Sequence, residues 1–156
     1  MTIELNAPIP EFSALKATSE TEISSGTLTD KFSVLYFYPK DSTSGCTLES
    51  QDFSRLHDEF VALNCQIFGI SRDSIKSHEN FKAQQSMPFE LISDPDEALC
   101  SAFDVMKMKN MYGKQVRGVE RSTFLIDQSG VLVAEWRKVK VPGHADEVLE
   151  TLRGLS

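Results

Sequence analysis

The chain contains several short apolar runs that are bounded by turn-forming residues. Residues 32–38 and 66–70 are rich in aromatic and β-branched side chains, a composition typical of buried strands. Residues 122–126 and 131–136 have the same character and flank an Asp-Gln-Ser-Gly turn at 127–130, which predicts a hairpin. These runs supply the strands of the predicted fold.

The segments between the predicted strands show the spacing of apolar residues that is typical of helices. Apolar residues recur at spacings of three and four along residues 44–63, at Phe53, Leu56, Phe60 and Leu63. This spacing predicts one amphipathic helix between the first two strands. Further helices are predicted at 75–85, 96–103 and 145–152. The alternation predicts a single domain over residues 1–156 of the α/β class, with a thioredoxin-like fold: a central mixed β-sheet flanked by helices and preceded by an N-terminal extension.

Composition narrows the possible partners. The 156 residues are 40% hydrophobic and carry a net charge of -7, which disfavours binding to nucleic acid and to anionic membranes. No apolar run approaches a membrane span, and the acidic first residues lack the features of a secretion signal, so a cytoplasmic location is expected. The three cysteines, an odd number at wide spacing, are not typical of a disulfide framework.

The cysteine with the most informative surroundings is Cys46. It follows the first predicted strand at the start of the long helix, where Thr43 is a candidate N-cap whose hydroxyl would accept a backbone N–H bond. A sulfur in the first helical turn faces unpaired N–H donors and the positive end of the helix dipole. Both favour the thiolate over the thiol, and the thiolate is the nucleophilic form.

The same stretch resembles the peroxiredoxins. Pro39, Thr43 and Cys46 fit their Pro-x-x-x-Thr-x-x-Cys signature, and the surroundings resemble the subfamily called peroxiredoxin Q or bacterioferritin comigratory protein. The resemblance extends nearly end to end, through Ala7-Pro8 with Phe12, Phe37-Tyr38-Pro39-Lys40-Asp41, Glu49, Glu120-Arg121-Ser122-Thr123-Phe124, Trp136-Arg137-Lys138-Val139 and Gly143-His144.

The resemblance implies a thiol peroxidase that reduces hydrogen peroxide and organic hydroperoxides through a sulfenic acid. Cys46 would be the peroxidatic cysteine, Thr43 would orient the peroxide, Arg121 would hold positive charge beside the sulfur and Pro39 would shield the pocket. Gly45 and Glu49 are expected to contribute to substrate binding. Because a thiolate that forms easily is also a weaker nucleophile, most of the rate enhancement is assigned to groups that act on the transition state.

Two departures from the subfamily pattern affect the mechanism. Ser44 stands where most members have proline, which costs only some rigidity because serine also suits a helix start. Gln51 stands where many members carry a resolving cysteine, and the predicted helix at 75–85, where others carry it, has none. Burial is the commoner reading of Cys65 and Cys100. We therefore expect a one-cysteine cycle in which an external thiol (thioredoxin, glutaredoxin or glutathione) reduces the sulfenic acid.

No cofactor and no metal are expected, because His57, His78 and His144 are far apart and none has metal-ligand spacing with a cysteine; they are read as solvated or hydrogen-bonded. The stretch before Arg121 is basic, with Lys107, Lys109, Lys114 and Arg117, and is interpreted as a solvated loop; the alternative is a local positive field that draws anionic or polar partners towards the pocket. Met111 and Tyr112 in the same loop could instead wall the pocket with apolar surface. Resemblance to the subfamily suggests a monomer.

Simpler interpretations stay open. Arg121 could pair with Glu120 or Asp127 on the surface, and Glu49 could support the helix start as a capping-box partner. A thioredoxin-like disulfide reductase would need a Cys-x-x-Cys motif, which the chain lacks after Cys46. A non-catalytic thioredoxin-like binding or chaperone module is the alternative function, and it would show no cysteine-dependent peroxide consumption.

Overall fold

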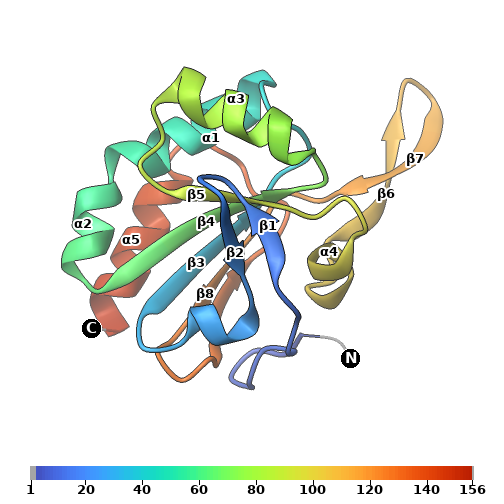
Figure 1. Ribbon diagram of the computed structural model, residues 1–156. Helices are drawn as coiled ribbons and strands as arrows, with labels where there is room; N and C mark the ends of the chain where they lie inside the picture. The colour runs from blue at the N-terminus through green and yellow to red at the C-terminus, as the bar shows by residue number, and fades with distance from the viewer. Residues whose placement is uncertain (1–2, 156) are drawn as a thin grey trace.

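A mixed β-sheet forms the centre of the molecule (Figure 1). The computed structural model describes residues 3–155, and only the backbone at Met111. Within that range seven strands lie in the order β2-β1-β5-β4-β3-β8-β9. Their bounds are β1 Leu15–Ala17, β2 Thr21–Ile23, β3 Phe32–Phe37, β4 Cys65–Ser71, β5 Glu90–Ser93, β8 Ser122–Ile126 and β9 Leu132–Trp136.

The middle of the sheet is buried on both faces. β3, β4 and β5 run parallel, whereas β8 pairs antiparallel with the other side of β3. Every residue of β3 is buried, because Val34 and Tyr36 face one apolar cluster and Leu35 and Phe37 face the other. This two-sided burial explains why the sequence of β3 is continuously apolar rather than alternating.

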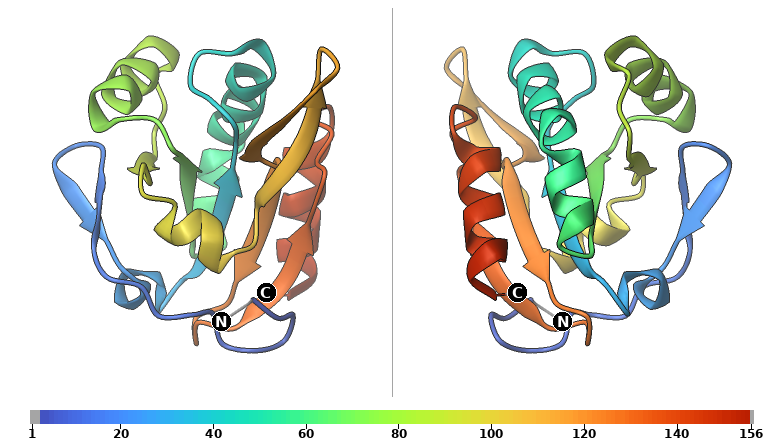
Figure 2. Two further views of the ribbon diagram at one scale, coloured as in Figure 1. Left: turned by 90° about the vertical axis from the view of Figure 1, so that its right-hand side faces the viewer. Right: turned by 90° about the vertical axis from the view of Figure 1, so that its left-hand side faces the viewer.

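Helices cover one face of the sheet more fully than the other. Residues of α1 (Ser44–Arg55), α2 (His57–Ala62), α3 (Ile75–Gln85) and α5 (His144–Leu155) enter the first cluster. The short helix α4 (Ala98–Ala102) and the 3-10 turn η1 (Ser25–Leu28) contribute to the second. Figure 2 shows α1, α3 and α5 standing on one side of the sheet and α4 and η1 on the other.

Helix α1 is fixed to the sheet by aromatic packing. Phe53 is fully buried, and its ring stacks on Tyr36 with 4.8 Å between centroids. Truncating a buried phenylalanine costs about 3–5 kcal/mol. This contact therefore holds the helix that begins beside Cys46 firmly against β3.

The thioredoxin-like α/β prediction is confirmed, and three local predictions need correction. The helix predicted over 44–63 ends at Arg55 and resumes at His57, because Leu56 (φ -94°, ψ 1°) leaves helical geometry. The short strands β1, β2 and β5 were not predicted. No helix in residues 3–155 is long and apolar enough to cross a membrane.

The third correction concerns the stretch interpreted as a solvated loop. It is a hairpin of β6 (Met106–Met111) and β7 (Lys114–Val119), which stands apart from the main sheet (Figure 1). Tyr112 and Gly113 between the strands both have positive φ, at 52° and 79°, as two-residue hairpin turns require. Alternating Met and Lys before this turn was the sequence signal that could have revealed it.

Candidate active site

Strand pairing brings two distant segments together at one end of the sheet. Helix α1 follows the last residues of β3, and Arg121 directly precedes β8. Because β3 and β8 are antiparallel with Phe37 opposite Ser122, the exit of one strand lies beside the entrance of the other. The topology therefore places Arg121 against the first turn of α1, where Cys46 lies.

Cys46 occupies the third helical position of α1. Thr43 is the N-cap residue by backbone conformation (φ -85°, ψ 157°), as predicted, but its side chain forms no capping bond. Its hydroxyl instead donates to the Lys40 carbonyl at 2.9 Å, so the expected hydroxyl cap is wrong. Cys46 is 1% exposed and lies at the N-terminal, positive end of the helix dipole.

One guanidinium group binds both Cys46 and Glu49. Nη2 of Arg121 donates to Cys46 Sγ at 3.2 Å, and Nη1 donates to Glu49 Oε1 at 2.6 Å. The Arg121 side chain is 17% exposed and that of Glu49 is 1% exposed. The alternative in which Arg121 pairs with Glu120 or Asp127 on the surface is therefore wrong. The capping-box role of Glu49 is wrong as well, because the third helical position, from which a capping-box partner reaches the N-cap, is occupied by Cys46.

Burial sets the electrostatics of this triad. Burial raises the pKa of Glu49 to about 7, although the charge and hydrogen bond of Arg121 oppose the rise. Burial would lower the pKa of Arg121, but Glu49 and the Cys46 sulfur outweigh it and raise that pKa. Oε2 of Glu49 is buried without a hydrogen-bond partner. The guanidinium is thus permanently charged, whereas its carboxyl partner changes charge near neutral pH.

The remaining sequence-predicted residues surround the triad in different ways. Gly45 lies against the guanidinium, since a Cβ at this position would be 3.3 Å from Arg121 Nη2. Pro39 is half-buried after the fully buried Tyr38. Gln51 is exposed on α1, where its amide donates to Gln85 of α3 at 2.8 Å. The absence of a side chain at Gly45 therefore leaves room for the guanidinium, while Gln51 joins α1 to α3.

The other two cysteines are buried thiols. Cys65 is 2% exposed at the start of β4, and burial raises its pKa to about 12. Cys100 is fully buried on α4, in the apolar cluster on the opposite face of the sheet from Cys46. Burial and the neighbouring Asp94 raise the pKa of Cys100 well above its ordinary value. Both thiols are poor nucleophiles at neutral pH.

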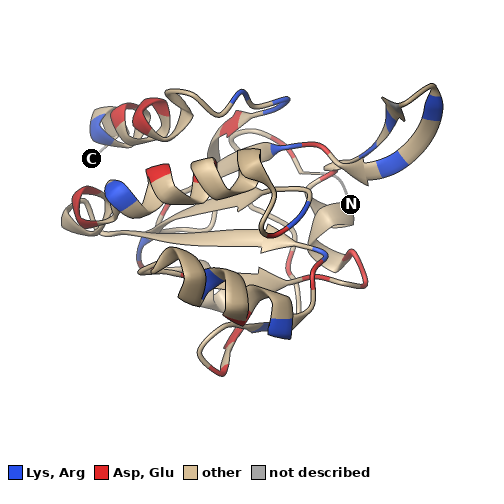
Figure 3. Ribbon diagram, turned by 90° about the horizontal axis from the view of Figure 1, so that it is seen from above, with Lys and Arg blue, Asp and Glu red and all other residues tan. Residues whose placement is uncertain are grey.

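The basic stretch before Arg121 forms the β6–β7 hairpin, which brings positive charge near the site. Figure 3 shows Lys and Arg positions along this hairpin. Lys109 is partly buried and donates to the Val119 carbonyl; burial first and then Arg121 lower its pKa. Tyr112 is 99% exposed at the tip, so it does not wall a pocket, and the side chain of Met111 lies outside the described residues.

Histidine and carboxylate groups come together at one further place. Asp41, Asp73 and His78 bring metal-type ligand atoms within 4.8 Å of one another, the one such group found in residues 3–155. Their atoms are engaged in hydrogen bonds with neighbouring protein groups. His144 is also buried and bonds Thr123, and burial lowers its pKa to about 4. Sequence reasoning treated these histidines as ordinary polar residues and did not foresee the Asp41–His78 contact.

Comparisons with known proteins identify the family of this chain. The model of the AhpC/TSA family matches residues 5–135. Peroxiredoxin Bcp of Bacillus subtilis (strain 168) is 46% identical over 156 residues, covering 100% of this chain and 99% of the relative. A structure of Xanthomonas campestris peroxiredoxin Q is similar at 51% identity and TM-score 0.89, covering 96% of this chain and 98% of the other.

A second solved structure comes from work on the alkyl peroxide reduction activity of the X. campestris bacterioferritin comigratory protein. It shares 50% identity with this chain at TM-score 0.89, covering 95% of this chain and 98% of the other. The similarity therefore extends over nearly the whole length of both chains.

Proposed function

The chain belongs to the AhpC/TSA family, in its peroxiredoxin Q or bacterioferritin comigratory protein subfamily, and we propose that it is a thiol peroxidase whose attacking sulfur is Cys46. The observation that carries this assignment is the 3.2 Å contact between Cys46 Sγ and Arg121 Nη2. A guanidinium at this distance stabilises a thiolate and can also stabilise negative charge on a reacting oxygen.

The reaction begins with displacement at the O–O bond. The Cys46 thiolate attacks the terminal peroxide oxygen, an S–O bond forms, and the O–O bond breaks with its electron pair on the departing oxygen. That oxygen takes a proton and leaves as water or an alcohol, and Cys46 becomes a sulfenic acid. Arg121 is placed to stabilise the transition state, because its guanidinium lies 3.2 Å from the attacking sulfur.

Thr43 and its neighbours are proposed to hold the peroxide. Because the Thr43 hydroxyl donates its one proton to the Lys40 carbonyl, its lone pairs are free to accept the O–H of the peroxide. This polarity would turn the peroxide oxygen toward Cys46. Pro39 shields this end of the pocket, and Gly45 lets the guanidinium approach. Glu49 acts on substrate binding through Arg121 rather than by direct contact.

The substrates are proposed to be hydrogen peroxide and organic hydroperoxides. Alkyl peroxide reduction is described for the similar bacterioferritin comigratory protein of X. campestris. The reaction at the sulfur is the same for both substrates, because only the departing oxygen differs.

The oxidised cysteine is proposed to be reduced by an external thiol. Gln51 replaces the resolving cysteine, Cys65 and Cys100 are buried with raised pKa values, and Cys100 lies across the sheet. Thioredoxin, glutaredoxin or glutathione would attack the sulfenic acid, forming a mixed disulfide and releasing water. A second thiol would then release reduced Cys46 and carry away the disulfide.

Mass spectrometry after one equivalent of peroxide tests the sulfur and the cycle together. We expect a sulfenic acid at Cys46 alone, a glutathione adduct at Cys46 when glutathione is present, and no peroxide consumption by Cys46→Ser. Cys100→Ala is the matched control and should keep parental consumption. Consumption that persists in Cys46→Ser would refute the assignment, while a disulfide from Cys46 to Cys65 or Cys100 would refute only the one-cysteine cycle. A well-folded protein with no peroxide consumption would favour the binding or chaperone module.

We also propose that the protein acts as a monomer in the cytoplasm. Three of its large exposed apolar side chains lie on the β6–β7 hairpin, and the other four are spread over the N-terminal segment, α1, α2 and α5. In the described range they are Leu5, Leu48, Val61, Met108, Tyr112, Val116 and Leu155. A reducing compartment would supply the external thiol that this cycle requires. Light scattering across concentrations and cell fractionation test the two statements.

A further inference from the structure

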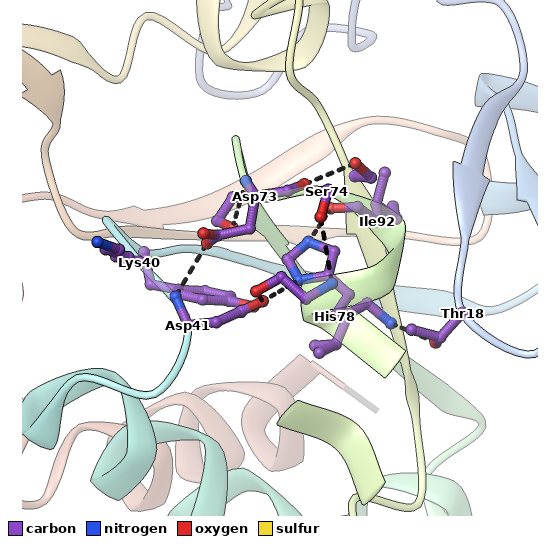
Figure 4. Close-up of polar contacts among 12 residues, drawn as sticks. Thr18, Lys40, Asp41, Asp73, Ser74, His78 and Ile92 are labelled. Atoms are coloured by element: carbon purple, nitrogen blue, oxygen red, sulfur yellow. Dashed lines mark hydrogen bonds and ion pairs between the residues drawn. The ribbon is translucent and has the colours of Figure 1, made fainter. Parts of the chain in front are cut away.

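A buried polar cluster lies beneath the loop that leads into α1. His78, on α3, is completely buried, and Asp41, in the loop, is 5% exposed. The imidazole lies between two oxygens: its Nδ1 is 2.7 Å from Asp41 Oδ2 and its Nε2 is 2.9 Å from the Ile92 carbonyl. Figure 4 shows the ring bridging these two groups.

Both sides of the His78 ring are held by hydrogen bonds. A carbonyl oxygen only accepts, so Nε2 of His78 carries a hydrogen that it donates to Ile92. The hydroxyls of Tyr38 and Ser77 also donate to Asp41, at 2.6 Å and 2.8 Å. With hydroxyl donors on both of its oxygens, Asp41 shares one further hydrogen bond with Nδ1 of His78 at 2.7 Å. The two side chains are therefore linked inside a fully hydrogen-bonded buried cluster.

Asp41 anchors the loop by its backbone as well. Its N–H donates at 2.9 Å to Asp73 Oδ2, which also accepts from the Ser71 hydroxyl at 2.5 Å. The next residue, Ser42, has φ 63°, a left-handed conformation that is unfavourable for a non-glycine residue. Such a conformation persists only where the surroundings hold it.

The anchored loop sets the position of the groups that act on peroxide. Thr43 follows Ser42 directly, and its carbonyl accepts the helical bond from Thr47 at 2.9 Å, so the start of α1 depends on this loop. Pro39 lies two residues before Asp41. A shift of Asp41 would therefore move the Thr43 hydroxyl and the first turn that carries Cys46.

We propose that Asp41 and His78 are positioning residues for the peroxide reaction. They hold Thr43 and the first turn of α1 in the correct position relative to Arg121. This inference rests on the proposed function of Cys46. Neither residue is placed to touch the substrate, so each acts through the loop. A displacement of reacting groups by about 1 Å can lower a reaction rate roughly 100-fold. The Asp41–His78 contact can therefore control turnover although it lies away from the sulfur.

Two isosteric variants of His78 separate positioning from simple packing. The amide nitrogen of asparagine occupies the place of Nδ1, whereas that of glutamine occupies the place of Nε2. His78→Asn therefore keeps the donor to Asp41, and His78→Gln keeps only the donor to Ile92. We expect the second-order rate of Cys46 oxidation by hydrogen peroxide to fall by about tenfold in His78→Gln and to stay within about threefold of the parent in His78→Asn.

Thr18→Val is the control for lost stability alone. Thr18 is fully buried, donates to Glu90 at 2.6 Å and accepts from the Leu91 N–H at 2.9 Å, so its side-chain hydrogen bonds go to β5 rather than to the Asp41 loop (Figure 4). This variant should lower the Tm while keeping the parental rate. If His78→Gln does not fold, Tyr38→Phe removes another donor to Asp41 and should slow oxidation about threefold.

The outcomes are distinct. Equal rates in His78→Asn and His78→Gln, whether reduced or parental, would overturn the positioning role, as would a slow Thr18→Val. A parent protein that shows Cys46-dependent peroxide reduction together with a parental rate in His78→Gln leaves the proposed function standing and removes only this inference. An inactive parent overturns both.

Discussion

Replacing Glu49 by glutamine should change how the stability of the protein depends on pH. Glu49 is 1% exposed, and its Oε1 accepts from Arg121 while Oε2 has no partner. Glutamine keeps the shape of the side chain and an oxygen for Arg121, but it cannot take up or lose a proton. The substitution therefore isolates the protonation of this one carboxyl group.

The sign of the effect follows from the two pKa values. Burial raises the pKa of Glu49 from 4.5 to about 7 on folding. Between these values the folded protein holds the proton and the unfolded chain does not, so unfolding releases a proton. The stabilising contribution is complete below pH 4.5 and is lost as the pH rises through about 7. The difference between the two pKa values corresponds to about 3 kcal/mol, a large part of a typical unfolding free energy of about 5–15 kcal/mol.

Denaturation of the parent protein and of Glu49→Gln by guanidinium chloride, at a series of pH values, measures this contribution. We expect the free energy of unfolding of Glu49→Gln, relative to the parent, to increase by about 3 kcal/mol between pH 4.5 and pH 7.5. Glu22→Gln removes an exposed carboxylate on β2 and is the matched control, for which no such increase is expected.

A stability difference between parent and Glu49→Gln that stays constant over this pH range would refute the reasoning. It would mean that Arg121 compensates fully for the burial of Glu49, so that the carboxyl stays ionised. A decrease with rising pH would mean that the ion pair dominates burial outright.

Three further substitutions test close contacts of the site and the core. Arg121→Lys should slow Cys46 oxidation by about 100-fold, because an ammonium cannot reach the sulfur and Glu49 with the fork of a guanidinium; stopped-flow kinetics measures this, and a change below threefold would contradict it. Gly45→Ala would place a Cβ 3.3 Å from the guanidinium, so the rate should fall about threefold to tenfold at an unchanged Tm; an unchanged rate would show that Arg121 moves without cost. Gly69→Ala would place a Cβ 2.7 Å from side-chain atoms of Tyr36 and Leu91, and should lower the unfolding free energy by about 2 kcal/mol in denaturant titrations; an unaltered midpoint would mean that the core repacks freely.

The sequence by itself determined the features that depend on local pattern. Continuous apolar runs predicted β3, β4, β8 and β9, and the spacing of Phe53 and its apolar neighbours predicted the helix that begins near Cys46. The location of the cysteine at a helix start could be read directly, because strand and helix periodicities change there. The β6–β7 hairpin was missed because its many charged side chains were interpreted as a solvated loop despite the alternation of Met and Lys in β6, and β5 because four residues are too few to show a period.

Tertiary structure decided which distant groups meet. Arg121 reaches Glu49 and Cys46 across 72 and 75 residues of sequence because β3 and β8 pair antiparallel, and no local pattern encodes that register. The raised pKa of Glu49 exists only when packing removes water from its carboxyl group. His78 likewise has an unremarkable helical neighbourhood in the sequence, and only the docking of α3 against the loop after β3 makes it the partner of Asp41.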